Sequence, residues 1–384
     1  MDDRDASASI GPLTQSRVTL AGTAVVVVGL VLATRAFDVD RIGATVAGAD
    51  RQLLALAVGV YAASWPLRGR RYADVLDAMD HRAGTGFLTL AVFASQTANL
   101  AIPARAGDAV RAHLIRARRD VPYPAGFASL AIERAFDLVT VAALAGGSLL
   151  ALAALGEATP WTIAGEMAGG ERALTVAAGV GVAAVAAAVV VLALARSDAR
   201  IESALRERAA TRPFVERAID AAVEFLADVA IVARSPRAIV AIGLGSLLVW
   251  SADVVTAVLV LAALGAELDA TALVVVGTLA VSVGNLAKVL PLSQGGIGLY
   301  EAAFTGLVVG LTPVGASLAL AAAIVDHALK NVVTLVGGAV AVVSLNVSLA
   351  EAADADAETG ETVREAGSVE STATARDPDA ESAD

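Results

Sequence analysis

Several residue types are scarce or missing in this chain of 384 residues, and each absence excludes a class of site. Cysteine is absent, so there is neither a disulfide framework nor a thiolate metal site. The three histidines, His81, His113 and His327, are far apart and fit no zinc-binding spacing. Lysine occurs only at Lys288 and Lys330, and no glycine-rich loop of the ATP-binding kind is present. We therefore expect no metal ion and no other cofactor.

Charge is also scarce, and what there is of it is unevenly placed. Charged residues make up 17% of the chain and hydrophobic residues 57%, against about 25% and 45–50% in soluble domains. Of the net charge of −11, residues 351–384 hold eleven acids and two arginines, which leaves 28 acids and 26 bases elsewhere. A hydrophobic, nearly neutral body excludes a soluble globular enzyme and a basic nucleic-acid-binding module. The surplus of surface acid indicates a halophilic organism.

Long apolar runs predict an all-α polytopic integral membrane protein with about eight transmembrane helices in the cell membrane. The expected spans are 18–34, 52–67, 124–155, 173–195, 238–264, 271–290, 297–311 and 316–349. They form one transmembrane domain, 18–349, between a cytoplasmic N-terminus, 1–17, and a disordered acidic tail, 350–384. The first span follows no basic region and has no cleavage site, so we expect it to be retained.

Arginine is unevenly distributed among the connections, which bears on orientation. Four arginines lie in 68–85, five in 104–120 and eight in 196–237, but one in 156–172 and none in 265–270. If 86–102 enters the membrane and returns to the same side, 68–85, 104–120 and 196–237 are all cytoplasmic, as are both termini. The connection 35–51 is then outside and holds three arginines, partly offset by three aspartates. The alternative, a full crossing by 86–102, would put arginine-rich connections on both sides. Within the last connection, about 213–232 has the spacing of an amphipathic cytoplasmic helix.

Two segments interrupt the apolar pattern with proline, glycine and charge. One contains Asn99, Pro103, Arg105, Gly107, Asp108 and Arg111; the other contains Asn285, Pro291, Ser293, Gly295, Gly296, Gly298 and Glu301. Proline ends the first helix of each segment, and irregular backbone is tolerated at membrane depth only inside protein or beside water. Paired interrupted helices in two pseudo-repeat halves are typical of transporter sites, where free helix N-termini can bind an anionic group. Helix capping is the alternative role for the two asparagines and for the acids Asp108 and Glu301.

Charges also lie inside the spans. Glu133, Arg134 and Asp137 fall in 124–155, where each costs about 2.5–3.5 kcal/mol to insert and is expected to face the protein interior. Arg134 can reach Asp137 at i+3, so the three either line a cavity or brace the bundle as a neutral triad.

Four more polar residues lie inside later spans: Asp253, His327, and the pair Asp326 and Lys330. Asp253 is near Trp250 in the sequence. The pair is spaced i, i+4 and is expected to be structural.

Taken in order, N-x3-P-x-R-x-G-D-x2-R, E-R-x2-D and P-x-S-x-G-G-I-G-x2-E resemble the transmembrane region of the lysylphosphatidylglycerol synthase/flippase-like family, over about residues 18–349. The resemblance implies a membrane protein that moves anionic lipids, and archaeal relatives are implicated in flipping dolichol-phosphate-linked sugars. Pro103 and Pro291 are expected to break the helices. The residues expected to contact the substrate are Asn99, Arg105, Gly107, Asp108, Arg111, Glu133, Arg134, Asp137, Asn285, Ser293, Gly295, Gly296, Gly298 and Glu301. Asp108 stands where glutamate is usual, and His327 lies about where the family tends to carry an arginine. The family's soluble aminoacyl-transferase domain is not found, so synthase activity is not expected.

The favoured hypothesis is a translocase for an anionic phospholipid or a polyprenyl- or dolichol-phosphate-linked sugar. Arginines and broken-helix N-termini would bind the phosphate, and membrane lipids would be the partners. No ATPase, metal or nucleophile motif is found, so we expect no enzyme activity. One alternative is an intramembrane lipid-phosphate transferase that uses Glu133, Asp137 and Glu301. The other is a non-catalytic membrane partner of a glycosyltransferase.

Overall fold

The computed structural model describes residues 39–101, 107–154, 225, 227–288 and 296–346, and the regular elements of these residues are helices. In chain order they are α2 Val39–Ala47, α3 Arg51–Ala78, α4 Thr85–Ala101, α5 Gly107–Arg119, α6 Tyr123–Ala154, α11 Pro236–Ala263, α12 Ala270–Ala287, α13 Leu299–Leu311 and α14 Ala316–Leu345. The expected all-α class is confirmed. The predicted N-terminus, the spans 18–34 and 173–195 and the acidic tail lie outside the described residues.

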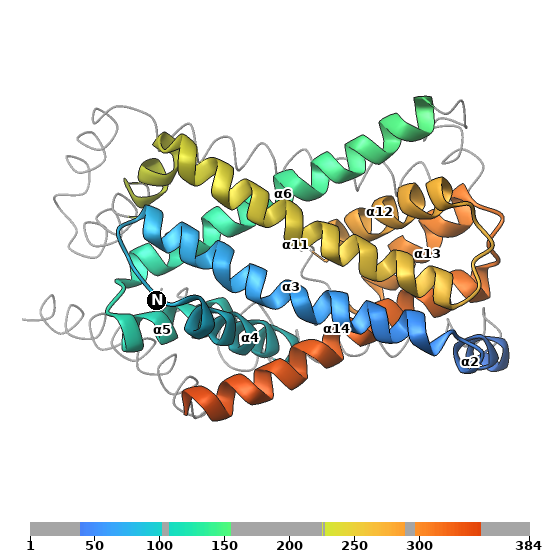
Figure 1. Ribbon diagram of the computed structural model, residues 1–384, viewed down its shortest axis with the longest axis horizontal. Helices are drawn as coiled ribbons and strands as arrows, with labels where there is room; N and C mark the ends of the chain where they lie inside the picture. Colours follow the sequence, from blue (N-terminus) through green and yellow to red (C-terminus); the bar gives the residue numbers. More distant parts are fainter. Residues whose placement is uncertain (1–38, 102–106, 155–224, 226, 289–295, 347–384) are drawn as a thin grey trace, which may run out of the picture.

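Four long helices, α3, α6, α11 and α14, run lengthwise through the molecule (Figure 1). They have 28 to 32 residues, so each is about 40–50 Å long, more than the roughly 30 Å of a bilayer core. By length and composition α11, α12 and α14 can each cross a membrane. Val332, Val336 and Val343 are exposed along α14, as on a surface that contacts lipid. These features agree with a polytopic membrane protein.

The first interrupted segment forms an antiparallel hairpin of α4 and α5. At one end Asn99 of α4 accepts a hydrogen bond from the backbone of Gly107, where α5 begins. At the other end the Arg119 guanidinium of α5 lies 4.3 Å from the ring centre of Phe87 in α4. The turn between the helices, 102–106, lies outside the described residues.

The second interrupted segment forms the same kind of hairpin from α12 and α13. Gly284 of α12 lies against the ring of Tyr300 near the start of α13. Farther along both helices, Leu307 and Leu311 pack against the cluster that contains Leu279. The turn between these helices, 289–295, is again outside the described residues.

The two hairpins enter the body from opposite ends, α4–α5 on the left and α12–α13 on the right of Figure 1. Both returning helices, α5 and α13, have 13 residues, or about 20 Å, too short for a roughly 30 Å core. Each hairpin therefore returns to the end at which it starts. This agrees with the re-entrant interpretation of 86–102, whereas 297–311, expected as a separate span, is the returning arm of a hairpin.

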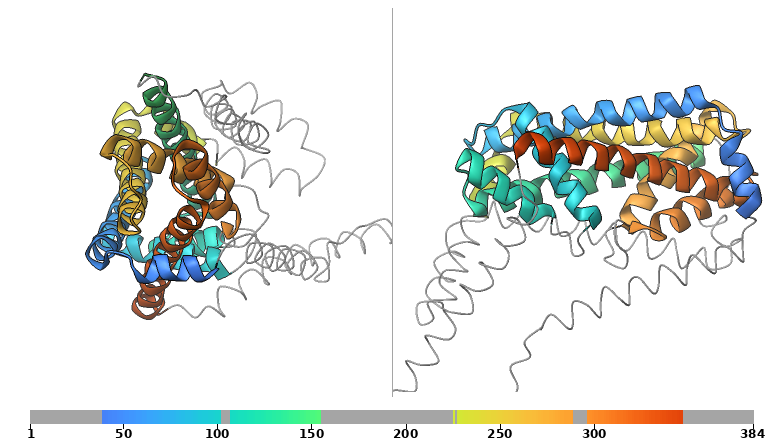
Figure 2. Two further views of the ribbon diagram at one scale, coloured as in Figure 1. Left: turned by 90° about the vertical axis from the view of Figure 1, so that its right-hand side faces the viewer. Right: turned by 90° about the horizontal axis from the view of Figure 1, so that it is seen from below.

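Each end of the molecule is tied together by contacts between distant segments. At the left end, Arg118 of α5 donates a 2.6 Å hydrogen bond to the Leu345 carbonyl at the end of α14. At the right end, the N–H of Asp50, the N-cap of α3, donates to the Ala263 carbonyl of α11 at 2.8 Å. Two hydrophobic cores follow each other along the bundle, one around α3 and α6 and the other around α11 to α14. The views of Figure 2 show this elongated arrangement from one end and from below.

Two expectations from the sequence were wrong: the end of one span and the absence of a helix from one connection. The span predicted as 52–67 is part of α3, which continues to Ala78 because its arginine Arg71 is buried and neutralised by other helices. The connection expected over 35–51 contains the helix α2. Of the predicted amphipathic helix, the described part 227–232 is helical, with Val229 and Val232 in the core and Ile231 exposed.

Candidate functional site

Asn99 closes the tip of the first hairpin. Its Oδ1 accepts from the Gly107 N–H at 2.9 Å, and its Nδ2 donates to Asp108 Oδ1 at 3.4 Å. A Cβ at Gly107 would overlap the Ser95 carbonyl oxygen and the Asn99 amide, so glycine is needed for this close approach. Of the two roles that the sequence left open for Asn99, the structure shows capping: the side chain satisfies a backbone donor at the start of α5.

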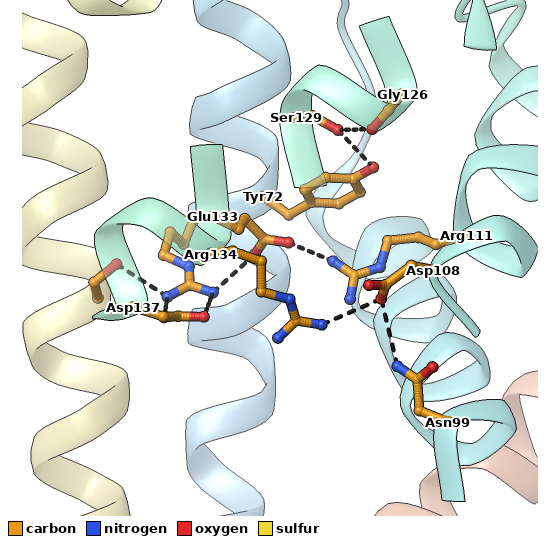
Figure 3. A network of polar contacts seen from close by, with 11 residues as sticks. Tyr72, Asn99, Asp108, Arg111, Gly126, Ser129, Glu133, Arg134 and Asp137 are labelled. Atoms are coloured by element: carbon orange, nitrogen blue, oxygen red, sulfur yellow. Dashed lines mark hydrogen bonds and ion pairs between the residues drawn. The ribbon is translucent and has the colours of Figure 1, made fainter. Parts of the chain in front are cut away.

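Glu133 of α6 bridges arginines from two other helices (Figure 3). Arg71 of α3 donates to Glu133 Oε1 at 2.8 Å, and Arg111 of α5 pairs with Oε2. Arg71 also contacts Asp137 at 2.5 Å, and Trp250 Nε1 donates to the same carboxylate at 2.8 Å. The side chains of Arg71, Arg111 and Glu133 are at most 6% exposed. This is a buried ion cluster whose members depend on one another for charge compensation.

Arg134 points from α6 toward the hairpin and pairs with Asp108 of α5 at 3.2 Å (Figure 3). Its side chain is 34% exposed and that of Asp108 21%, so this pair is the accessible part of the group. Three guanidinium groups thus face three carboxylates. We call these six residues the arginine cluster: Arg71, Asp108, Arg111, Glu133, Arg134 and Asp137.

The ion pairs of the predicted α6 triad come from other helices. Glu133 and Asp137 pair with Arg71, and Arg134 pairs with Asp108, in place of the i, i+3 pair expected between Arg134 and Asp137. Sequence reasoning had placed Arg71 in a loop. The spacing of Tyr72, Leu76 and Met79 continues the buried face of α3 past the predicted end of the span, and these three residues belong to the core.

The second hairpin is held at the start of α13 by Glu301. Its Oε2 accepts from the Gly298 N–H at 2.6 Å, and its Oε1 lies 2.6 Å from His327 Nδ1 of α14. The helix-capping alternative for Glu301 is thus realised, together with a contact to His327. Gly296 and Gly298 have φ of 74° and 87°, the left-handed region that glycine adopts without strain.

A chain of polar contacts joins α11, α12, α13 and α14 beside this hairpin. Lys330 lies 3.1 Å from Asp253 and 2.9 Å from Asp326. Tyr300 donates its hydroxyl to Asp326 at 2.5 Å. Asn285 donates to Asp253 at 3.4 Å and to the Val281 carbonyl of its own helix at 2.9 Å. The predicted pair of Asp326 and Lys330 is therefore present and is shared with α11.

Lys288, at the end of α12, completes this group. Its ammonium lies 4.2 Å from the ring centre of Tyr300, a cation–π distance. Its methylene chain occupies the space where a Cβ of Gly296 would stand. We call the following residues the lysine cluster: Asp253, Asn285, Lys288, Tyr300, Glu301, Asp326, His327 and Lys330.

The predicted site residues thus fall into two groups, one at each hairpin. Asn99, Gly107, Asp108, Arg111, Glu133, Arg134 and Asp137 meet at the first, and Asn285, Gly296, Gly298 and Glu301 at the second. Five predicted residues lie outside the described residues: the helix-breaking Pro103 and Pro291, and Arg105, Ser293 and Gly295. Substrate contact remains a prediction for every residue to which it was assigned. Reasoning from the sequence missed Arg71, Lys288 and Tyr300. Within the described ranges, no group of three acidic or histidine side chains could hold a metal ion.

Comparison with known proteins relates the chain to a family and to a relative. The family model described as "Lysylphosphatidylglycerol synthase TM region" matches residues 19–338. A protein of Haloferax volcanii named "Glycosyltransferase AglD" is 46% identical over an alignment of 362 residues that covers 91% of this chain. The chain spans 58% of the length of that relative.

Proposed function

The chain belongs to the lysylphosphatidylglycerol synthase transmembrane family, and on this premise we propose that it translocates an anionic lipid between the two leaflets. The lipid is a phospholipid or a polyprenyl- or dolichol-phosphate-linked sugar, and the protein is not itself an enzyme. The observation that carries this proposal is the pair of hairpins that enter from opposite ends, each with charged residues at its tip. Such paired interrupted elements are a common architecture of substrate sites in transporters.

The arginine cluster supports recognition of a phosphate group. Arg134 is its most exposed cation and is paired with one carboxylate, that of Asp108, at 3.2 Å. A lipid phosphate offers the same acceptor geometry to a guanidinium, with more charge. We therefore propose that the phosphate displaces Asp108 from Arg134, while Arg71 and Arg111 stay paired with Glu133 and keep the hairpin in place.

The lipid tail would stay in the bilayer while the headgroup follows the polar groups. The sequence has no P-loop to couple transport to ATP. Transport is then driven by the lipid gradient or by an ion gradient. We propose that this end of the bundle is cytoplasmic. The arginine-rich connections support this orientation, as does the end of α5, with Arg116, Arg118 and Arg119 in its last turn.

The test is transport by the purified chain in liposomes, with a fluorescent phosphatidylglycerol and a fluorescent polyprenyl-phosphate-linked sugar as probes. A quencher that cannot cross the bilayer reports the probe left in the outer leaflet. Arg134→Gln should slow transport of the preferred probe about tenfold or more, because a charge-assisted contact contributes about 1.5–3 kcal/mol. Arg70→Gln is the matched control, since Arg70 lies on the surface and pairs with Asp74. Transport no faster than in empty vesicles would overturn the proposal.

The name of the Haloferax volcanii relative favours a second candidate, a membrane partner of a glycosyltransferase that presents a lipid phosphate to it. An intramembrane lipid-phosphate transferase is the related alternative. The partner candidate predicts that membranes containing this chain and the glycosyltransferase transfer labelled sugar to a polyprenyl phosphate faster than membranes with either protein alone. Only the transferase alternative predicts transfer by the purified chain. Deletion of residues 351–384 tests whether the tail is needed for the partnership.

A further inference from the structure

Nearly every buried or half-buried cation at the two clusters has an acidic partner. Arg71 and Arg111 pair with Glu133, Arg134 with Asp108, and Lys330 with Asp253. These pairs satisfy the need of an intramembrane charge for compensation.

Arg68 and Lys288 are the exceptions in the part of the chain that the structure describes. Neither has a carboxylate oxygen within 4.0 Å or a hydrogen-bond acceptor for its cationic group.

Lys288 is held so that its ammonium stays available. Its methylene chain is fixed against Gly296, and its Nζ lies over the Tyr300 ring at 4.2 Å. The ring attracts the positive charge but accepts none of the three ammonium hydrogens in the way that an oxygen does. The Tyr300 hydroxyl is already used by Asp326, to which it donates at 2.5 Å. Tyr300 therefore positions Lys288 without neutralising it.

Arg68 is held in a comparable way on α3. Its guanidinium lies 5.7 Å from the Tyr61 ring centre and 5.5 Å from that of Trp65. Trp65 is fixed in turn by stacking on Phe93 of α4, with ring centres 3.6 Å apart. The Arg68 Nε is buried and has no acceptor. This cation, too, is supported by aromatic faces and lacks an anion.

Asp253 is the carboxylate that lies within electrostatic range of both cations. It is bound to Lys330 at 3.1 Å. Asp326 and Glu301 also lie within range of Lys288, but Asp253 and Asp326 contact Lys330 and Glu301 contacts His327. Neither Arg68 nor Lys288 therefore has a carboxylate of the described residues in direct contact. In a low-dielectric interior an anion that supplies several acceptor oxygens would be stabilised strongly there.

We propose that Arg68 and Lys288 bind the phosphate group of a membrane lipid, at a position separate from the arginine cluster. The inference rests on the proposed lipid translocation and adds two cations that hold the headgroup, Arg68 from α3 and Lys288 from the second hairpin. Lys330, locked between Asp253 and Asp326, supports this position and does not contact the phosphate. Tyr300 and Trp65 act as positioning residues.

The composition of the chain allows a direct test, because Lys288 and Lys330 are its only lysines. The full chain in detergent is treated with an amine-acylating reagent, and the modification of each lysine is followed by mass spectrometry. Farnesyl phosphate, dihexanoyl phosphatidylglycerol, inorganic phosphate and uncharged farnesol are added in parallel. A lipid phosphate at ten times its Kd should slow acylation of Lys288 about tenfold and leave Lys330 unchanged. Protection by either phosphate lipid supports the site, and the comparison identifies the preferred one.

Three outcomes would overturn the inference: no protection, equal protection by farnesol, or protection by inorganic phosphate alone. Variants give a second measurement, the affinity for the protecting lipid. Lys288→Gln and Arg68→Gln should each weaken it about tenfold or more, with Lys288→Arg retaining most of it and Arg70→Gln unchanged. The result is distinguishable from failure of the translocase proposal. If the protein transports lipid but Lys288 is not protected, only this second phosphate site is refuted. If Lys288 is protected but no transport is seen, only the translocase proposal is refuted.

Discussion

Removal of the charge on Glu133 should destabilise the protein more than any similar change at the surface. Glu133 is the carboxylate that compensates Arg111, and it shares Arg71 with Asp137. In Glu133→Gln the amide keeps the shape of the side chain and loses its charge. Arg71 retains Asp137, but Arg111, whose side chain is 2% exposed, is left without a carboxylate among the described residues.

The size of the effect follows from this single uncompensated cation. Removal of one partner from a buried ion pair typically costs about 3–5 kcal/mol. Spread over a helical domain of this size, such a loss lowers the unfolding temperature by about 6–20 °C, at about 2–4 °C per kcal/mol. The cation–π contact of Arg111 with Tyr72, at 5.0 Å, compensates only a small part of it.

The assay is thermal unfolding of the purified protein in detergent, followed by circular dichroism. Glu267→Gln is the matched control, because Glu267 is exposed in the connection between α11 and α12, and it should leave the unfolding temperature within about 1 °C. The double variant Glu133→Gln with Arg111→Gln should lose about 1–3 kcal/mol less than the sum of the single losses. A Glu133→Gln protein as stable as the control, or strict additivity in the double variant, would refute the reasoning.

Two further predictions concern the hairpin tips. Gly107→Ala should destabilise the protein by about 1–3 kcal/mol, because the new Cβ meets the backbone of α4, which cannot move aside. Gly59→Ala is the control, because nothing lies within 4 Å of its Cβ, and it should gain up to about 1 kcal/mol of stability from helix propensity. Equal unfolding temperatures for the two variants would contradict this prediction. Glu301→Ala should cost about 1–3 kcal/mol through the loss of both the cap and the His327 contact. Glu301→Gln should cost less than half as much, since its amide oxygen still accepts from Gly298, and a larger loss on denaturant unfolding would argue against the cap.

The interrupted segments show how far the sequence could be taken. Pro103 and Pro291, with the glycines that follow them, are enough to locate both hairpins along the chain, because each residue type has a specific backbone consequence. Arginine counts favoured the re-entrant form of 86–102. It was harder to predict from the sequence that 297–311 is the returning arm of a hairpin. Its composition is that of a short span, and the 13-residue length of α13 together with its packing against α12 identifies the returning arm.

By itself, the sequence determined the all-helical membrane class, the positions of most helices and the two interruptions, because these depend on composition and on neighbours a few residues away. Only the tertiary structure decided which charges meet. Arg71 and Glu133 are 62 residues apart, and Arg71 and Ser246 are 175 apart; whether such groups pair depends on how whole helices pack. For the same reason, the sequence shows that there are two lysines but does not show how their surroundings differ. Lys330 contacts two carboxylates, whereas Lys288 lies on an aromatic ring and contacts no carboxylate of the described residues.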